Sequence, residues 1–218
     1  MVMEHINDLL FLALNAGPRP PRFVLGVALF LANWLAPLAI LLFVGLWIRK
    51  PARDRSALIT ATLTMLLGLV VNQALGLLYF HPRPFMAGIG RQYLAHAADN
   101  SFPSDHATFL WSLGFSLLAL GALRGWAALL LIAGVAIAWA RIYVGVHFPF
   151  DMLGSLFVAL AVAPLSKAIN SPVERWLTPF CVRLYEDAIR LCRLPRLFFP
   201  RKSDEKQCDL DLTIGGID

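Results

Sequence analysis

Five long apolar stretches dominate the chain, and each is close to the length that a membrane-spanning helix needs. The hydrocarbon core of a bilayer requires about 20 mostly apolar residues in a helix. The stretches are approximately Phe23–Ile48, Ala57–Phe80, Ser104–Leu123, Trp126–Val146 and Phe148–Ile169. This pattern predicts an all-α, polytopic membrane helix bundle with about five transmembrane helices.

Two further segments are apolar on one side only. Glu4–Asn15 has Glu4 and Asp8 on its polar side and is too short to span, so we predict an interfacial helix. Val173–Leu194 alternates apolar residues with arginines, which is typical of a basic amphipathic helix on an anionic membrane surface. We therefore expect a membrane-embedded domain over residues 1–170, with an interfacial N-terminal segment 1–22, and a cytoplasmic amphipathic tail over 171–218. Its last residues, 201–218, are polar and predicted to be mobile.

The composition supports an integral membrane protein. Hydrophobic residues make up 58% of the chain and charged residues 15%, with a mean hydropathy of +0.66. These values exclude a disordered chain. The net charge of +5 is too small to indicate nucleic-acid binding, despite a pI near 9.4. Three cysteines cannot form a disulfide framework.

The basic residues predict the orientation in the membrane. If the five stretches alternate in direction, fourteen of the nineteen Lys and Arg lie on one face: four between Arg49 and Arg55, then Arg124, and nine from Lys167 onward. The positive-inside rule makes this face cytoplasmic. The opposite face then holds an unusual group of ionisable residues, which are candidates for a functional site at membrane depth. They are His81, His96, His106, His147, Asp99, Asp105, Asp151, Arg83 and Arg141.

Three short segments bring most of this group together. They are His81–Phe85, Ser101–His106 and Arg141–Asp151. Two arginines, a serine and a helix N-terminus make a binding site for a tetrahedral anion, because guanidinium groups and free backbone N–H groups match phosphate oxygens. The two histidines of the second and third segments can supply a nucleophile and a proton donor.

The spacing of the third segment assigns the nucleophile. Asp151 follows His147 by four residues, and Pro149 suits a first helical turn. The carboxylate can therefore reach one imidazole nitrogen, which fixes the tautomer and leaves the other nitrogen free to attack.

These motifs resemble those of the type 2 phosphatidic acid phosphatase superfamily. Arg83-Pro84 is similar to the end of the first motif of the superfamily, and Pro103-Ser104-Asp105-His106 is similar to its second motif. The Arg-x5-His-x3-Asp pattern that ends at Asp151 is similar to its third motif. The residues of the first two motifs are more similar still to those of the bacitracin-resistance branch of undecaprenyl-diphosphatases. In that branch the first motif continues into Arg-Pro-Phe and the second reads Ser-Phe-Pro-Ser-Asp-His. The resemblance covers about Asn72 to Asp151, and the layout of the stretches extends it to about residue 170.

The resemblance implies a role for each matching residue. His147 is the nucleophile that forms a phosphohistidine, Asp151 orients it, and His106 is the general acid and then the base. Arg83, Arg141 and Ser104 hold the phosphoryl oxygens. The implied mechanism needs no cofactor and no metal. A zinc site is the competing interpretation of the histidines, but they lack a closely spaced ligand pair.

Two positions depart from the family pattern. The superfamily places a lysine seven residues before the first-motif arginine, where this chain has Gly76. His81, Arg91 or His96 could compensate, and the sequence does not choose among them. Asp105 stands where the commonest second motif has glycine, although the bacitracin-resistance branch shares the aspartate. We also expect Asn72 and Gln73, polar residues inside an apolar stretch, to form hydrogen bonds between helices.

The resemblance implies hydrolysis of undecaprenyl diphosphate to undecaprenyl phosphate, at a bacterial inner (plasma) membrane and with the site facing the periplasm. The expected partners are a polyprenyl or other lipid phosphate and the bilayer, with no nucleic acid. Three alternatives stay open: a phosphatidylglycerophosphate or phosphatidate phosphatase, a lipid phosphotransferase with the same site, and a non-catalytic transporter or scaffold. The sequence leaves the oligomeric state open.

Overall fold

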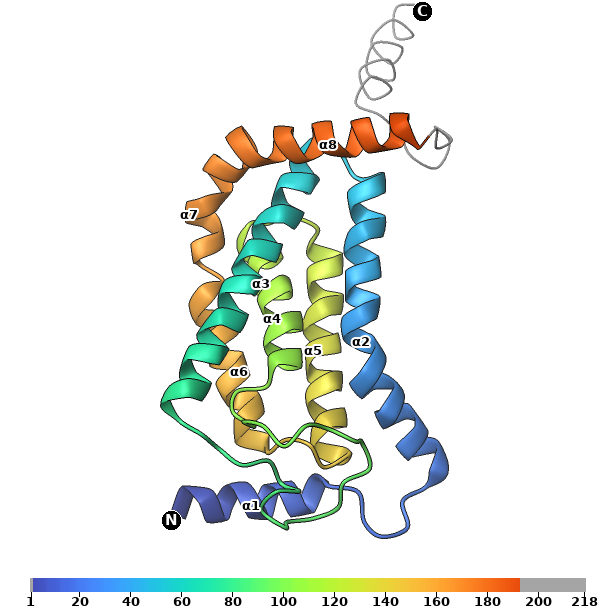
Figure 1. The fold of residues 1–218 in the computed structure, drawn as a ribbon, viewed down its shortest axis with the longest axis vertical. Coiled ribbons are helices and arrows are strands. Elements are labelled where there is room, and N and C mark those ends of the chain that lie inside the picture. The colour runs from blue at the N-terminus through green and yellow to red at the C-terminus, as the bar shows by residue number, and fades with distance from the viewer. Residues whose placement is uncertain (1, 193–218) are drawn as a thin grey trace, which may run out of the picture.

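Helix α4 (Asp105–Ala119) lies at the centre of a helical bundle, in contact with α3 (Ala52–Leu78), α5 (Arg124–Tyr143) and α6 (Pro149–Val162) (Figure 1). The computed structural model describes residues 2–192, and every regular element in this part of the chain is helical. The other elements are α1 (Val2–Leu14), α2 (Arg22–Arg49), α7 (Leu165–Pro172), the π-helical turn η1 (Val173–Leu177) and α8 (Thr178–Leu191).

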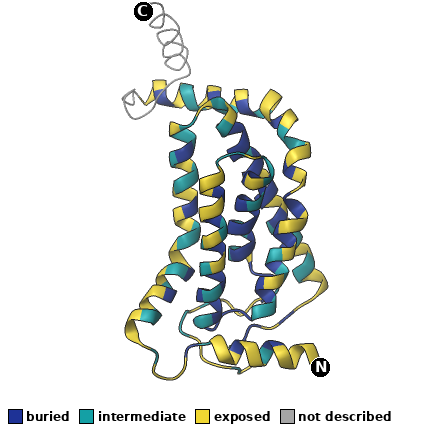
Figure 2. Ribbon diagram, turned by 180° about the vertical axis from the view of Figure 1, so that it is seen from behind, coloured by how far each residue is buried: buried dark blue, intermediate teal, exposed yellow. Residues whose placement is uncertain are grey.

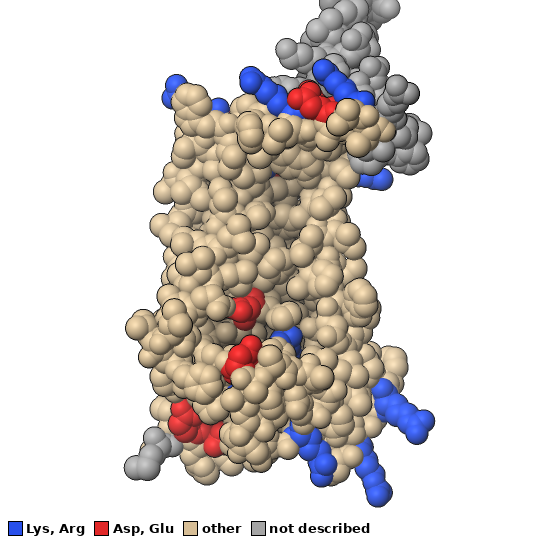
Figure 3. All heavy atoms as spheres, viewed as in Figure 1, with Lys and Arg blue, Asp and Glu red and all other residues tan. Residues whose placement is uncertain are grey.

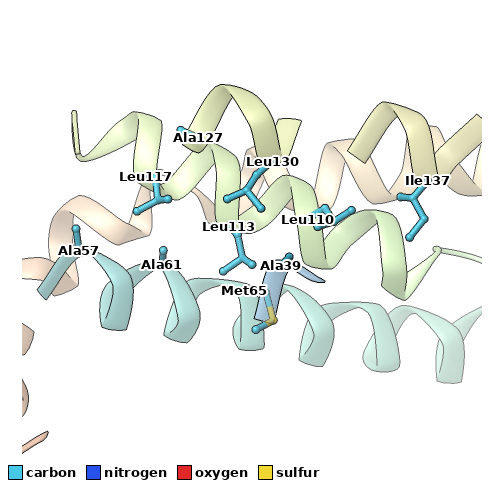
Figure 4. Packing of buried hydrophobic residues seen from close by; sticks show 10 residues of the cluster. All are labelled: Ala39, Ala57, Ala61, Met65, Leu110, Leu113, Leu117, Ala127, Leu130 and Ile137. Carbon is cyan, nitrogen blue, oxygen red and sulfur yellow. The ribbon is translucent and has the colours of Figure 1, made fainter. Parts of the chain in front are cut away.

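Leucines of α4 fill the core between α3 and α5. Leu110, Leu113 and Leu117 are at most 2% exposed (Figure 4). They pack against residues of α3 and α5, namely Ala57, Ala61, Met65, Ala127, Leu130 and Ile137. Three of these six are alanines. Small residues let helix backbones approach closely, which is how helices associate within a bilayer. Figure 2 shows the buried residues inside the bundle and exposed residues around it.

Fewer helices than predicted meet the length and apolarity of a membrane span. In the described part of the chain α2, α3 and α5 do, and a fourth span results if α6 and the following helix, bent by 44°, are counted together. The predicted stretch Ser104–Leu123 forms only the 15 residues of α4. It ends at a turn because Gly121 and Leu123 both have positive φ. The stretch Phe148–Ile169 is interrupted after Val162, next to Pro164.

Helices α1 and α8 lie across opposite ends of the bundle (Figure 1). The inner side of α1 buries Asn7 and Phe11, whereas Val2, Met3 and Leu9 are exposed. The segment predicted to be an interfacial helix forms α1, which covers the end of the bundle where the long loop 79–104 lies. An exposed apolar side on such a helix suits a position in the membrane interface.

The predicted boundary at residue 170 falls inside a helical stretch. Asn170 of α7 accepts hydrogen bonds from Thr60 and Ser56 of α3, at 3.0 and 3.4 Å. From there η1 and α8 continue across the end of the bundle and contact α3. Residues 193–218, which include the segment predicted to be mobile, lie outside the described residues.

One of the basic residues at the α8 end is a packing residue. Arg55 is 2% exposed, and its Nε donates to the Trp47 carbonyl at 2.9 Å. Its guanidinium lies over the rings of Trp47 and Tyr185, at 5.6 and 5.4 Å from the centroids. Charged side chains otherwise gather at the two ends of the molecule. On the face that Figure 3 shows, acidic and basic side chains also meet in a hollow near the α1 end.

Candidate active site

A cavity of about 310 Å³ lies at the α1 end of the bundle, bounded by α3, the loop 79–104, α4, α5 and the connection between α5 and α6. The three predicted segments meet here. Seven of the nine ionisable candidates are in its lining, namely Arg83, His96, Asp99, Asp105, His106, Arg141 and His147. Arg83 and His147 are more than 60 positions apart in the sequence, so the packing of the helices is what brings them to one cavity.

The His147–Asp151 pair has the geometry that the spacing predicts. His147 Nδ1 lies 3.2 Å from Asp151 Oδ2, and both residues are at most 2% exposed. Asp151 Oδ2 also accepts the Phe148 backbone N–H at 2.8 Å and the Ser101 hydroxyl. A carboxylate beside Nδ1 assigns the ring proton to that nitrogen. The lone pair of Nε2 then faces Arg83.

Ser101 opens the second predicted segment, and the motifs predict no role for it. The structure places it beside the His147–Asp151 pair. Its hydroxyl lies 3.3 Å from His147 Nδ1 as well as donating to Asp151. A serine three residues before the predicted phosphate-binding Ser104 has no distinguishing signal in one sequence. Its position depends on how the loop enters α4.

Arg83 is held by four groups around His147. Nε donates to Asp99 Oδ1 at 2.7 Å, and Nη1 donates to the Val146 carbonyl at 2.9 Å. Nη1 also lies 3.0 Å from His147 Nε2, and Nη2 donates to the Asn100 carbonyl at 3.1 Å. Burial alone would raise the pKa of Asp99, but the hydrogen bond and charge of Arg83 outweigh it and hold that pKa below its usual value. The guanidinium is therefore fixed at the bottom of the cavity.

Arg141 is also buried, but most of its donors are free. It is 2% exposed, and its one hydrogen bond runs from Nη1 to the Ala32 carbonyl at 3.5 Å. Nε and Nη2 have no partner among the described residues. Unpaired buried donors cost free energy unless a ligand accepts from them, and charged donors cost most. These two N–H groups are therefore suited to bind the oxygens of an anion in the cavity.

Ser104 is less accessible than predicted. Its side chain is 0% exposed, and it is not among the cavity-lining residues. Its carbonyl accepts the Ser155 hydroxyl at 2.9 Å, which ties the start of α4 to α6. The Ser104 hydroxyl has no partner among the described residues. The residue sits at the N-cap position of α4, directly before Asp105 and His106.

Among the described residues, the Asp105 carboxylate is hydrogen-bonded to two amides and forms no ion pair. Its two oxygens accept hydrogen bonds from Asn72 at 2.9 Å and from Gln73 at 3.2 Å. Asn72 also donates to Thr108 at 3.0 Å. The predicted hydrogen bonds between helices therefore exist, and they join α3 to the first turn of α4. This turn also carries His106 into the cavity.

We expect the Asp105→Gly variant to fold and to keep part of the activity, because the carboxylate positions α4 and has no predicted chemical role. The loss of two partly exposed amide contacts is expected to lower the free energy of unfolding by about 1 kcal/mol. Phosphate release and thermal unfolding in detergent measure both effects. If the folded variant is as inactive as His147→Ala, Asp105 belongs to the catalytic set.

The position of the missing lysine is occupied by a neighbouring side chain. A Cβ at Gly76 would lie 2.7 Å from Asn100 Nδ2. Asn100 Oδ1 accepts the His81 backbone N–H at 2.7 Å, so this amide holds the loop in place. Any larger residue at position 76 requires Asn100 to move. The glycine and the asparagine thus belong to one local arrangement of the loop against α3.

Neither His81 nor Arg91 supplies a replacement cation in the cavity. Arg91 is exposed, and its backbone is bound to Asn15. His81 lies on the far side of Asp151, outside the cavity lining. Of the three candidates only His96 lines the cavity, with its ring 6.3 Å from that of His147.

His96 does not supply this charge at neutral pH. Burial lowers its pKa, and the charge of Arg83 lowers it further, so the ring is neutral there. In the described residues, the permanent cations of the cavity lining are therefore Arg83 and Arg141. Residues 2–192 also contain no group of three or more His, Cys, Asp or Glu arranged to hold a metal ion.

The bundle and this cavity define a helical membrane protein with a histidine–aspartate pair beside two buried arginines. The PAP2 superfamily model matches residues 57–173, and the chain belongs to this superfamily. The resemblance inferred from the motifs is confirmed.

Two relatives place the chain more narrowly. It is 38% identical over 160 residues to the putative undecaprenyl-diphosphatase YbjG of Escherichia coli (strain K12), covering 73% of this chain and 80% of YbjG. It is 34% identical over 163 residues to the undecaprenyl-diphosphatase BcrC of Bacillus subtilis (strain 168), covering 75% and 83%.

Two solved structures share the fold. Aquifex aeolicus LpxE has a TM-score of 0.58 at 23% identity, covering 75% of this chain and 95% of LpxE. A PAP2-type phosphatidylglycerolphosphate phosphatase from Bacillus subtilis has a TM-score of 0.51 at 22% identity, covering 80% and 89%.

Proposed function

We propose that this membrane lipid phosphatase hydrolyses undecaprenyl diphosphate to undecaprenyl phosphate and inorganic phosphate through a phosphohistidine on His147. The observation that carries the proposal is the buried His147–Asp151 pair beside a cavity lined by Arg83 and Arg141. The names of YbjG and BcrC support the choice of substrate.

The reaction has two displacements at phosphorus. His147 Nε2 attacks the terminal phosphorus, the bond to the bridging oxygen breaks, and undecaprenyl phosphate leaves with a proton from His106. Water then attacks the phosphohistidine, gives a proton to His106 and releases phosphate, which regenerates His147. Arg83 and Arg141 offset the charge on the phosphoryl oxygens. The Asp151 carboxylate stabilises the positive charge on His147 when Nε2 bonds to phosphorus.

The cavity is placed to take a lipid headgroup from the side of the bundle. Gln73, Gly76 and Leu77 of α3 are in its lining. Leu77 is 89% exposed, and the next residue, Leu78, is 85% exposed. Such side chains at the end of an apolar helix suit contact with lipid tails. The diphosphate can therefore lie in the cavity while the isoprenoid chain stays along α3.

A substrate panel tests this function. We expect purified protein to release phosphate from undecaprenyl diphosphate with kcat/KM at least about tenfold above that for phosphatidylglycerophosphate or phosphatidate, a difference of about 1.4 kcal/mol. Activity is expected to survive exhaustive EDTA treatment, because the two arginines supply the charge that a metal would. Preference for a glycerolipid, transfer to a lipid acceptor instead of water, or restoration by one specific metal would each contradict part of the proposal.

The same proposal includes the membrane topology. We place five crossing segments in a bacterial inner membrane, α2, α3, α4, α5 and α6 with α7, so that the cavity faces the periplasm and the C-terminus the cytoplasm. These helices run roughly parallel in Figure 1. The sequence also has its excess of Lys and Arg in the segments predicted to be cytoplasmic.

Thiol labelling tests the topology. Ala97 is exposed in the loop 79–104, whereas Cys181 and Cys192 are in or next to α8. In intact cells with a permeabilised outer membrane, we expect the Ala97→Cys variant to react with a membrane-impermeant thiol reagent and wild-type protein not to react. The reverse pattern would place the cavity on the cytoplasmic side.

A further inference from the structure

A second histidine lies behind the catalytic pair, on the side away from the cavity. His81 Nδ1 is 3.3 Å from Asp151 Oδ1, and His81 Nε2 is 3.5 Å from Glu4 Oε2 in α1. Both ring nitrogens therefore face carboxylate oxygens. A neutral imidazole has only one N–H, whereas the imidazolium form carries one on each nitrogen. The arrangement suits a protonated His81.

Asp151 needs a partner at this position. Its side chain is 0% exposed, and three donors converge on Oδ2, from Ser101, His147 and Phe148. Neither Oδ1 nor the facing His81 Nδ1 has a hydrogen bond among the described residues, so the two atoms, 3.3 Å apart, meet as an ion pair when His81 is protonated. A buried carboxylate is costly unless a cation is near it. A charged His81 therefore favours the ionised Asp151 that His147 requires.

Helix α1 is attached to the turn that carries the pair. Asn7 Oδ1 accepts the Phe150 backbone N–H at 3.0 Å, in the first turn of α6. The Phe11 ring packs against the Phe148 ring with centroids 5.1 Å apart. Glu4 adds the contact to His81 and accepts the Tyr79 hydroxyl at 3.4 Å. The inner side of α1 thus contacts Phe148 and Phe150, which lie between His147 and Asp151 in the chain.

We propose that His81 is a positioning residue for the His147–Asp151 pair, and that Glu4 links it to the interfacial helix α1. The inference rests on the proposed function, because it concerns the same nucleophile. His81 acts on turnover only through Asp151, since it does not line the cavity. Without its charge, the buried Asp151 carboxylate takes up a proton more readily. A neutral Asp151 cannot stabilise the imidazolium form of His147, so the phosphoryl transfer to His147 is slower.

This arrangement has a consequence for the pH dependence. The groups that face His81 are Glu4 from α1, Asp151 from α6, and the rings of Tyr79 and Phe148. Asp151 raises the pKa of His81 above its ordinary 6.5, against the lowering effect of burial and with a smaller contribution from Glu4. The proton is therefore present at low pH and is lost as the pH rises through this raised pKa. We expect kcat to fall over the same range.

Neutral variants of the two residues test the proposal. Glu4→Gln removes one charge from beside the ring, and we expect the alkaline limb of kcat to move by roughly half a pH unit toward lower pH, with kcat below the limb unchanged. His81→Asn keeps an N–H for Asp151 but no titrating charge, so we expect kcat to fall roughly tenfold and this limb to disappear. KM for undecaprenyl diphosphate is expected to stay within about twofold in both, because neither residue touches the substrate.

Asp8→Asn is the matched control, because Asp8 is on the same helix without a bond to this group of residues. It is expected to leave the limb in place. Thermal unfolding in detergent is measured for every variant. A uniform loss of kcat without a shift of the limb, accompanied by a lower Tm, would assign Glu4 and His81 a purely structural role and overturn the inference. An unchanged pH profile in both variants would also overturn it, and the proposed function would stand if His147→Ala were inactive in the same assay.

Discussion

The His147→Ala variant is expected to release no measurable phosphate from undecaprenyl diphosphate, with kcat lower by at least about a thousandfold. The reason is that only this histidine combines a fixed Nδ1–H, bound to Asp151, with an Nε2 directed to the arginine-lined cavity. The variant is also expected to form no phosphoenzyme. Rapid quenching in alkali after mixing with substrate labelled in the terminal phosphate measures both, since phosphohistidine survives alkali.

Two variants accompany this measurement. His106→Ala lacks the proton donor but keeps the nucleophile, so we expect it to accumulate labelled phosphoenzyme from a substrate with a good leaving group. His5→Ala, at an exposed position in α1, is expected to behave as wild type. Because His147 is buried, folding is checked by thermal unfolding, and His147→Gln offers a second variant of more similar volume. Substantial turnover by either folded His147 variant would remove it from the nucleophile role.

The second large effect is expected for Arg83→Lys. Lysine keeps the charge but has one nitrogen, whereas Arg83 contacts Asp99, Asn100, Val146 and His147 through three. Each charge-assisted contact is typically worth about 1.5–3 kcal/mol. Without these anchors the cation is displaced from the phosphoryl oxygens, and the loss of one charge-assisted contact to them in the transition state lowers the rate roughly ten- to a hundredfold. We therefore expect kcat/KM to fall by at least about a hundredfold, since more than one contact is lost.

Arg91→Lys is the matched control, because Arg91 is in the same loop but exposed and outside the cavity lining. We expect it to retain full activity. Arg83 has no lysine at position 76 to share its role, because a side chain there would displace Asn100. If Arg83→Lys retained activity near wild type, the planar arrangement of donors would be unnecessary, and Arg141 would be the principal cation.

Most of the candidate residues that the structure brings together could be predicted from the sequence. Apolar stretches of spanning length alternate in direction, so they bring the segments around Arg83, His106 and Arg141 to one end. The pairing of His147 with Asp151 is local, because residues four apart at the start of a helix are neighbours. These inferences depend on chain periodicity and on short-range spacing, both of which can be read from one sequence.

The remaining features depend on contacts between segments that are far apart in the chain. The loop 79–104 has no periodicity, so the sequence could not place His81, Arg91 and His96, which lie in or beside it. In the structure His81 meets Glu4 and Asp151, His96 enters the cavity, and Arg91 stays outside.

The same holds at the start of α4. Asn72 and Gln73 meet Asp105 only because α3 packs against α4, and Ser104 is covered because α4 also packs against α6. Helices α4 and α6 are shorter than the apolar stretches that predicted them, since hydropathy measures apolar content and not the turns at Gly121 and Pro164 that end a helix. The sequence by itself determined which groups are candidates for the reaction and that they share one end of a membrane bundle. Tertiary packing decided which of the other polar residues support them, because those contacts depend on the three-dimensional path of a loop that has no regular structure to predict.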